Sequence, residues 1–399
     1  MPPHEGLVHL KEYDIKDSNV ELIGSDIDHR VKYNSAACEP AWNNGQVGQE
    51  CGLFMWRIEN FEVVPWPKER AGEFYDGDSY IVLHSYKVED KDKLCHDIFF
   101  WLGSKTTQDE AGTAAYKTVE LDEFLHGTAS QHREVQLHPS PEFMALFRRL
   151  SIRSGGVRSG FTHVDTERQP SKKVITLLRI FKHPGATRAD SVIVHEVEPT
   201  WQSLDDHDVF VLDQGEKIWV WQGKNCSPME KAKSAQVVND MTLAKHIDVE
   251  VLSQLDSRSK IVVDLLGGKE ITQSSFLEPR PVTFAGDRDR DESQSHKLFR
   301  LSDAAGAISF DLVKDGQQIS PSDLDGNDVF LYDTGRRLWV WQGSQASKRE
   351  KALWLKVAQS YVRQLQEDQT NSAAHLIPIS NVVEGHESPT FWKAIGVAA

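Results

Sequence analysis

The sequence has no long hydrophobic run and few cysteines. No stretch of about 18 apolar residues occurs along its 399 residues, so we expect no transmembrane helix. The charged N-terminus, MPPHEGLVHLKEYDIKDSN, lacks the apolar segment of a secretory signal. The four cysteines are scattered and form no CxxC pair, which indicates reduced thiols rather than a disulfide framework or a zinc site. We therefore expect a cytoplasmic protein.

The sequence also lacks a net positive charge and the common enzyme motifs. The formal net charge is -15 at pH 7, which argues against a general nucleic-acid binder because such proteins present a net basic face. No GxSxG or HExxH motif occurs, and the glycine-rich stretch SGGVRSG has no GK[ST] after it, as a phosphate loop requires. We expect a protein that is not an enzyme.

An internal repeat dominates the remaining sequence. Residues 208–223 read DVFVLDQGEKIWVWQG, and residues 328–343 read DVFLYDTGRRLWVWQG, 120 residues further on. A more divergent copy begins with DSYIVL at Asp78 and continues with FFWLG at 99–103. This first copy carries ten extra residues, around VEDKDKLCHD, for which we expect a longer hairpin loop. Three copies of domain size are therefore predicted.

Each copy predicts the same local structure. The alternating DVFVLD run predicts a strand, the following turn contains glycine, and IWVWQG predicts a second strand that returns beside the first. A helix is expected after Ser227 and after Ser347. The fold class is α+β, with a mixed central β-sheet between helices in each domain. The expected organisation is an N-terminal extension at 1–45, domains at 46–164, 174–277 and 298–399, and an acidic linker at 278–297.

Each copy also places an aspartate at the start of a strand and a glutamate at the start of the following helix. Calcium prefers carboxylate and carbonyl oxygens, so such a pair is a candidate metal site. A simpler alternative is the capping box, in which a serine or threonine three residues earlier and the glutamate cap the helix. The spacing alone leaves both roles open. The pairs are Asp78 with Glu110, Asp208 with Glu230, and Asp328 with Glu350, and the capping residues are Thr107, Ser227 and Ser347.

Four stretches of the first copy resemble the first domain of gelsolin-type proteins. They are GDSYIVL at 77–83, FFWLG at 99–103, QDEAGTAAYKTVELDEFLHGTASQHREVQ at 108–136 and GGVRSGFTHV at 155–164. With three copies, the chain resembles the three-domain, severin- and fragmin-like members of the gelsolin/villin superfamily. The resemblance implies three tandem gelsolin-like domains and a monomeric, calcium-dependent actin-binding protein of the actin cytoskeleton that severs filaments and caps barbed ends.

Two alternatives accompany this interpretation. One is barbed-end capping without severing, because the paired-arginine motif of the family's filament-side cluster is missing. The other is a binding module without actin activity, because gelsolin-like folds also occur in vesicle-coat proteins.

The resemblance also implies ligands for calcium. Each domain would use a carbonyl before the strand aspartate, that aspartate, the helix glutamate and a carbonyl near the domain's end, and the first domain would share a second calcium with actin. The implied positions are Gly77, Asp78, Glu110 and Val157; His207, Asp208, Glu230 and Asp287; Asn327, Asp328 and Glu350; and, for the shared calcium, Asp122, Gly127 and Ala129.

Two surfaces for partners are expected. The helix at 108–126 has one core face, and Tyr116, Val119 and Glu123 lie on the opposite face, although single exposed apolar residues such as Tyr116 and Val119 are ordinary. The resemblance implies that Tyr116, Glu120 and Glu123 contact actin. Phe161 and Arg188 match further actin contacts of the family.

A basic cluster would bind phosphatidylinositol bisphosphate through bidentate contacts, or would be a solvated face against actin or a neighbouring domain. Its members are Arg148, Arg149, Arg153, Arg158, Lys172 and Lys173.

Overall fold

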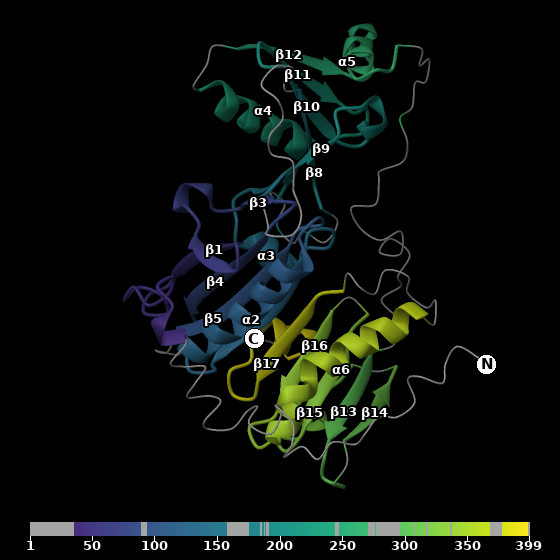
Figure 1. Ribbon diagram of the computed structural model, residues 1–399. Helices are drawn as coiled ribbons and strands as arrows, with labels where there is room; N and C mark the ends of the chain where they lie inside the picture. Colours follow the sequence, from purple (N-terminus) through teal and green to yellow (C-terminus); the bar gives the residue numbers. More distant parts are fainter. Residues whose placement is uncertain are drawn as a thin grey trace, which may run out of the picture.

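The computed structural model describes residues 36–88, 94–157, 175–183, 186, 188, 191–243, 247–269, 276, 296–306, 308–316, 318–335, 337–367 and 377–397. These residues form three modules, within 36–157, 175–276 and 296–397. Figure 1 shows the first module in the middle, with the second at one end and the third at the other.

The first module contains the repeat's strands in their longest form. Its central hairpin strands have nine residues each, against five or six in the other modules, so the ten-residue insertion lengthens the strands as well as the connection. Its elements are β1 (Gly52–Glu59), β2 (Glu62–Pro65), β3 (Glu73–Tyr75), β4 (Ser79–Lys87), β5 (Leu94–Leu102), α2 (Gln108–Phe124), β6 (Ala129–Val135), α3 (Pro141–Ala145) and β7 (Leu150–Arg153).

The second and third modules repeat this order. The second contains β8 (Thr176–Phe181), β9 (Ile193–Val197), β10 (Val209–Asp213), β11 (Lys217–Gln222), α4 (Pro228–Thr242), β12 (Asp248–Ser253) and α5 (Lys260–Leu265). The third contains β13 (Lys297–Ser302), β14 (Ser309–Asp315), β15 (Val329–Asp333), β16 (Leu338–Gln342), α6 (Lys348–Glu367), β17 (Ile379–Val383) and α7 (Pro389–Ala394).

All three modules share one strand order. Four strands pair antiparallel, antiparallel and then parallel, as β1-β4-β5-β6, β8-β10-β11-β12 and β13-β15-β16-β17. The parallel pair follows from the long helix, because a helix must carry the chain back to start a parallel strand. The predicted strand pair and the helix after Ser227 are therefore confirmed as β10, β11 and α4.

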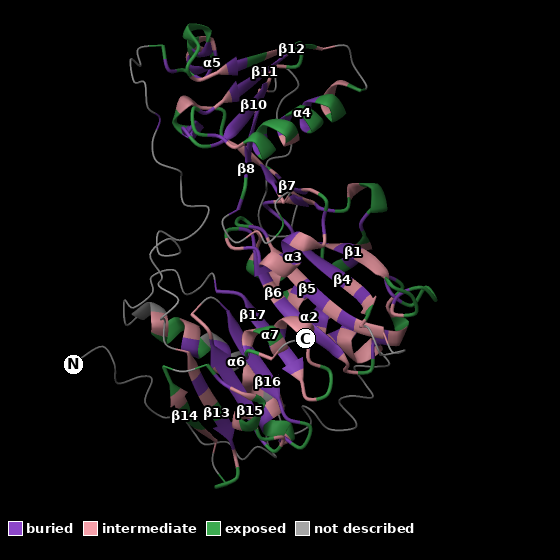
Figure 2. Cartoon of the chain, turned by 180° about the vertical axis from the view of Figure 1, so that it is seen from behind, coloured by how far each residue is buried: buried purple, intermediate pink, exposed green. Residues whose placement is uncertain are grey.

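Each sheet segment lies between a long helix and a short one. In the first module α2 covers one face through Ala114 and Leu121, and α3 covers the other through Phe143. The same pattern holds for α4 with α5 and for α6 with α7. Buried residues gather in the strands between these helices, as Figure 2 shows. Burial of large apolar side chains, at roughly 1.5–3 kcal/mol each, is the main force that holds such layers together.

The core of the first module reaches back to residues expected in an N-terminal extension. Trp42 is fully buried, and its ring meets Trp56 edge-on with the centroids 5.9 Å apart. Its indole nitrogen donates to the carbonyl of Ala36 at 2.8 Å. Residues 36–45 therefore belong to the first module rather than to an extension, because Trp42 is part of the core cluster that includes Trp56 and Leu121.

Strand pairing also joins the modules. The edge strand β17 of the third module pairs antiparallel with β6 of the first, which creates one ten-stranded sheet. On the other side, β7 and β3 of the first module extend the sheet of the second through a parallel pairing of β7 with β9. The first module is thus connected to both of its neighbours by backbone hydrogen bonds.

Candidate metal sites and interaction surfaces

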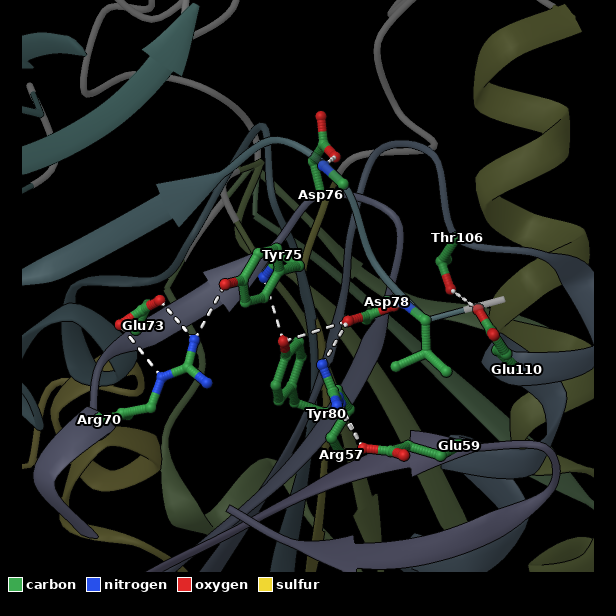
Figure 3. Close-up of polar contacts among 12 residues, drawn as sticks. Arg57, Glu59, Arg70, Glu73, Tyr75, Asp76, Asp78, Tyr80, Thr106 and Glu110 are labelled. Carbon is green, nitrogen blue, oxygen red and sulfur yellow. Dashed lines mark hydrogen bonds and ion pairs between the residues drawn. The ribbon is translucent and has the colours of Figure 1, made fainter. Parts of the chain in front are cut away.

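The first module brings Asp78 and Glu110 into one buried site (Figure 3). Asp78 directly precedes β4, and its Oδ1 accepts a hydrogen bond from the backbone N–H of Val157 at 2.8 Å. Glu110 lies in the first turn of α2, where its backbone N–H donates to the Thr107 hydroxyl at 3.3 Å. Burial raises the pKa of Asp78 to about 6, and the charge of Glu110 adds to that rise. Two carboxylates that destabilise each other's ionised form favour a cation between them.

The residues of this site fit a calcium ion. Glu110 Oε1 is buried, and no described residue forms a hydrogen bond with it. A β-carbon at Gly156 would lie 2.4 Å from Asp78 Oδ1, so glycine keeps the space beside that oxygen open. Within the described residues no three acidic, histidine or cysteine side chains converge, so a cation here would need backbone carbonyls beside the two carboxylates. Such oxygen ligands are the ones calcium takes.

In the second module the helix glutamate is fully engaged in the protein. Glu230 Oε2 accepts from the backbone N–H of Ser227 at 2.7 Å, while the Ser227 hydroxyl accepts from the Glu230 N–H, which completes a capping box. Glu230 Oε1 accepts from the backbone N–H of Lys182 at 2.8 Å. Burial raises the pKa of Asp208, and the guanidinium of Arg179 opposes that rise. In this module the glutamate therefore caps the helix, as the capping-box alternative predicted.

The third module resembles the second. Glu350 Oε2 accepts from the Ser347 N–H at 2.9 Å, and its Oε1 accepts from the Asp303 N–H at 2.7 Å. Burial raises the pKa of Glu350, with further contributions from the charges of Asp303 and Asp328. The Asp328 carboxylate lies 3.9 Å from Arg300. Asn327 directly precedes Asp328, as His207 precedes Asp208 and Gly77 precedes Asp78. Asp287 lies outside the described residues.

The three positions expected for a shared calcium are close together at the end of α2. Asp122 Oδ1 accepts from the backbone N–H of Ala129 at 2.9 Å, and Asp122 Oδ2 accepts from the side-chain amide of Gln131 at 2.8 Å. Gly127 adopts a φ of 66°, and its N–H donates to the Asp122 carbonyl at 2.8 Å. The turn therefore holds the carboxylate through backbone and side-chain donors.

Of the three α2 residues expected to contact actin, one is buried. Tyr116 is 54% exposed and Glu123 is partly exposed, as expected for residues that meet a partner. Glu120, however, is buried, and its carboxylate lies 2.6 Å from the ammonium of Lys117, which also pairs with Glu39 at 2.9 Å. Glu120 is therefore a poor candidate for a direct partner contact, because it is buried and its carboxylate is paired with Lys117.

Basic side chains line a groove between the first two modules. Its volume is about 830 Å³, and its basic lining residues are Arg70, Arg148, Arg149, Arg188 and Lys233. Lys233 was missed by the sequence argument because it lies 84 residues beyond Arg149 on α4. Arg149 of the first module forms an ion pair with Asp240 of the second at 2.6 Å. Part of the basic cluster therefore contacts a neighbouring domain, which was one of the two alternatives.

The rest of the basic cluster is not in this groove. Arg153 lies 3.6 Å from Glu196 and does not line it. Arg158, Lys172 and Lys173, as well as the expected actin contact Phe161, lie outside the described residues. Among the helices of the described ranges, none has the length and apolar character that a membrane crossing demands.

Three modules with one strand order and sheets between a long and a short helix define a tandem α+β repeat protein. The sequence model described as "Gelsolin repeat" matches residues 60–144, 190–263 and 314–392, one stretch in each module. These matches cover more than half of the chain, which belongs to the gelsolin family. The fold class and the family resemblance are thus confirmed, and membership places the chain among non-enzymatic proteins.

Curated relatives extend along nearly the whole chain. Gelsolin-like protein 1 of Lumbricus terrestris is 38% identical over 396 residues, which cover 98% of this chain and 99% of the relative. Severin of Echinococcus granulosus is 33% identical over 396 residues, with the same coverage of both chains. Gelsolin of Drosophila melanogaster is 34% identical over 88% of this chain but only 43% of its own length. The organisation therefore matches three-domain relatives.

One solved structure, the Thorarchaeota 2DGel3/rabbit actin complex, is similar over 53% of this chain and 97% of that chain at 23% identity. Its TM-score of 0.23 is too low to support a structural argument.

Proposed function

We propose that this protein is a cytoplasmic, calcium-dependent actin-binding protein that severs filaments and caps their barbed ends. The observation that carries the proposal is the alignment with Severin of Echinococcus granulosus, which includes 98% of this chain and 99% of that protein. An activity that depends on the cooperation of three domains requires all three to be present in order. The second candidate is capping without severing.

The buried carboxylate pair supports the calcium dependence. Asp78 and Glu110, with the carbonyls of Gly77 and Val157, would hold calcium in the first module. The homologous residues of the other modules would be His207, Asp208 and Glu230, and Asn327, Asp328 and Glu350. Calcium supplies a divalent charge that offsets the repulsion between the two carboxylates. Glu230 and Glu350 would exchange their capping hydrogen bonds for the cation, because a glutamate side chain swings between such partners at low cost.

Helix α2 is the proposed actin contact. Tyr116 and Glu123 lie on its outer side, and an amphipathic helix with an exposed aromatic residue suits a groove on a partner. Asp122, Gly127 and Ala129 lie at the end of the same helix, so a cation completed by a partner's carboxylate would link calcium to actin binding. Arg188, in the groove between the first two modules, is the remaining described candidate.

The shared ten-stranded sheet supports regulation by separation of the modules. Beside the β6–β17 pair, Arg337 of the third module forms a 2.5 Å ion pair with Glu142 of the first. We propose that this junction holds the first and third modules together without calcium, and that calcium loosens it. Phosphatidylinositol bisphosphate is a proposed second regulator, because Arg148, Arg149 and Lys233 line one groove.

Filament microscopy tests the function directly. Pre-formed, surface-attached actin filaments are exposed to the full chain with calcium or with chelator. The expected result is breaks along the filaments and arrested growth at barbed ends, both only with calcium. Arrested growth without breaks would support the second candidate. Unchanged filaments at saturating calcium would contradict both.

A further inference from the structure

Each module places an arginine on the strand beside its metal-site aspartate. On β1, β8 and β13 this arginine pairs with the residue two positions after the aspartate, as Arg57↔Tyr80, Arg179↔Phe210 and Arg300↔Phe330. In every module its guanidinium forms an ion pair with the aspartate: Arg57 with Asp78, Arg179 with Asp208, and Arg300 with Asp328. The local sequences WRIEN, LLRIF and LFRLS differ, so the shared position indicates a shared role.

The three ion pairs differ in closeness and burial. Arg179 contacts Asp208 through both Nε and Nη2 and lies 3.1 Å from Asp205, with only 6% of its side chain exposed. Arg57 approaches Asp78 at 3.4 Å and is 19% exposed. Arg300 remains 3.9 Å from Asp328 and is 47% exposed. Solvent weakens an exposed pair far more than a buried one.

The two closer guanidinium groups are held by neighbours other than the aspartate. Arg179 lies over the ring of Phe181 at 4.7 Å, and Arg57 lies over the ring of Trp66 at 4.9 Å. Arg57 also forms an ion pair with Glu59. A guanidinium that stacks on an aromatic ring stays in place when its carboxylate partner changes. Its positive charge would therefore remain near a cation bound to the same aspartate.

We propose that Arg57, Arg179 and Arg300 are internal counter-ions that compete with calcium for the strand aspartate of each module. Without calcium they neutralise a buried carboxylate, which would otherwise be strongly unfavourable. With calcium they repel the bound ion, so the closest and most buried arginine belongs to the weakest site. The affinity for calcium should thus decrease from the third module to the first and then to the second. This inference depends on the proposed binding of calcium.

Calcium titration calorimetry on the full chain tests the competition. Arg179→Met keeps the side-chain stem but removes the charge, and we expect the weakest site to bind about tenfold more tightly, which corresponds to about 1.4 kcal/mol. Thermal unfolding gives an independent result: the unfolding temperature of this variant should fall in chelator and rise more on calcium addition than that of the wild type. Lys217→Met is the matched control, because Lys217 lies at the other end of the β10–β11 pair.

The Asp208→Asn background shows whether the effect acts through the aspartate. In that background Arg179→Met should no longer increase the calcium affinity of the second module. If Arg179→Met does not fold, Arg57→Met and Arg300→Met replace it, with a larger gain expected for Arg57→Met. Wild-type protein without any calcium-binding heat would overturn the proposed calcium dependence itself. Two other outcomes would overturn only the counter-ion inference. One is that the wild type binds calcium and Arg179→Met has the same calcium affinities as the Lys217→Met control. The other is that Arg300→Met gains more calcium affinity than Arg57→Met.

Discussion

His132 on β6 and Ser380 on β17 join the first module to the third, with His132 Nδ1 2.9 Å from the Ser380 hydroxyl oxygen. The His132 ring stacks on Phe99 of its own module and meets Trp339 of the third module edge-on. Both His132 and Ser380 are buried. The junction is therefore a packed interface as well as a backbone pairing, and a single substitution there should disturb it.

Ser380→Lys should separate the two modules without calcium. A lysine at this fully buried position would bring a charge into the interface, which costs several kcal/mol unless the charge is paired. In chelator, small-angle scattering should show a larger radius of gyration than for the wild type, close to the calcium value. Ser322→Lys places the same residue at an exposed position of the third module and should scatter like the wild type. Equal compactness of the two variants would argue against a regulatory junction.

Glu110→Gln and Thr107→Ala should separate metal binding from helix capping. Glu110→Gln removes a charged ligand, and we expect calorimetry to detect one fewer calcium ion per chain. Thr107→Ala removes the hydroxyl that caps α2, which should lower the free energy of unfolding by about 1 kcal/mol and leave the calcium count unchanged. Loss of a calcium ion in both variants would mean that the two roles are not separable.

His195 should make the calcium-free protein less stable in acid. Burial lowers the pKa of His195 to about 4, with Arg179 and Lys105 contributing and Asp76 opposing. The unfolded chain takes up this proton near pH 6.5 and the folded chain only near pH 4, so stability contributed above pH 6.5 is lost as the pH falls through this window. The loss is at most about 3 kcal/mol at 1.36 kcal/mol per pH unit.

Thermal unfolding of His195→Asn between pH 7.5 and 4.5 measures this contribution. The variant should lose less stability than the wild type over that range in chelator, because asparagine does not titrate. The comparison between the two proteins removes the contributions of the other titrating groups. Parallel curves for variant and wild type would show that His195 is protonated equally in the folded and unfolded chains.

Tyr116→Asp should weaken barbed-end capping without unfolding the protein. Tyr116 is 54% exposed on α2, so the substitution leaves the core intact but puts a charge on the proposed contact surface. We expect barbed-end affinity to fall at least about tenfold, as for a central aromatic contact. Leu312→Asp, on the exposed strand β14, is the matched control and should cap normally. Normal capping by Tyr116→Asp would remove α2 from the proposed interface.

The repeat in the sequence predicts the fold of each module but not how the modules associate. Alternating apolar residues and Ser227 before the helix place β10, β11 and α4 correctly, because these signals are local. The pairing of β17 with β6 depends on the backbone groups of two edge strands, which leave no recognisable residue pattern.

The sequence likewise predicts only part of each candidate metal site, because some of its residues come together only through strand pairing. The aspartate and glutamate occur at matching places in the repeat, 22 residues apart in the second and third modules and 32 apart in the first, so the repeat identified them. Arg57 and Arg179 precede their aspartates by 21 and 29 residues, so no fixed interval marks them. Their common position appears only when the strands are paired. Glu120 was misplaced because the burial of a helix face by the segment around Glu39 is a tertiary effect.

The basic groove predicts a charge-dependent lipid contact. Arg148→Glu combined with Arg149→Glu reverses two charges in the groove, and we expect flotation with vesicles that contain phosphatidylinositol bisphosphate to fall at least fivefold, because arginine binds phosphate through charge-assisted hydrogen bonds. Arg258→Glu combined with Lys260→Glu changes the net charge equally on an exposed part of the second module, away from the groove. If both double variants lose flotation equally, the attraction is general charge rather than a site. If neither does, the groove serves the contact between Arg149 and Asp240 alone.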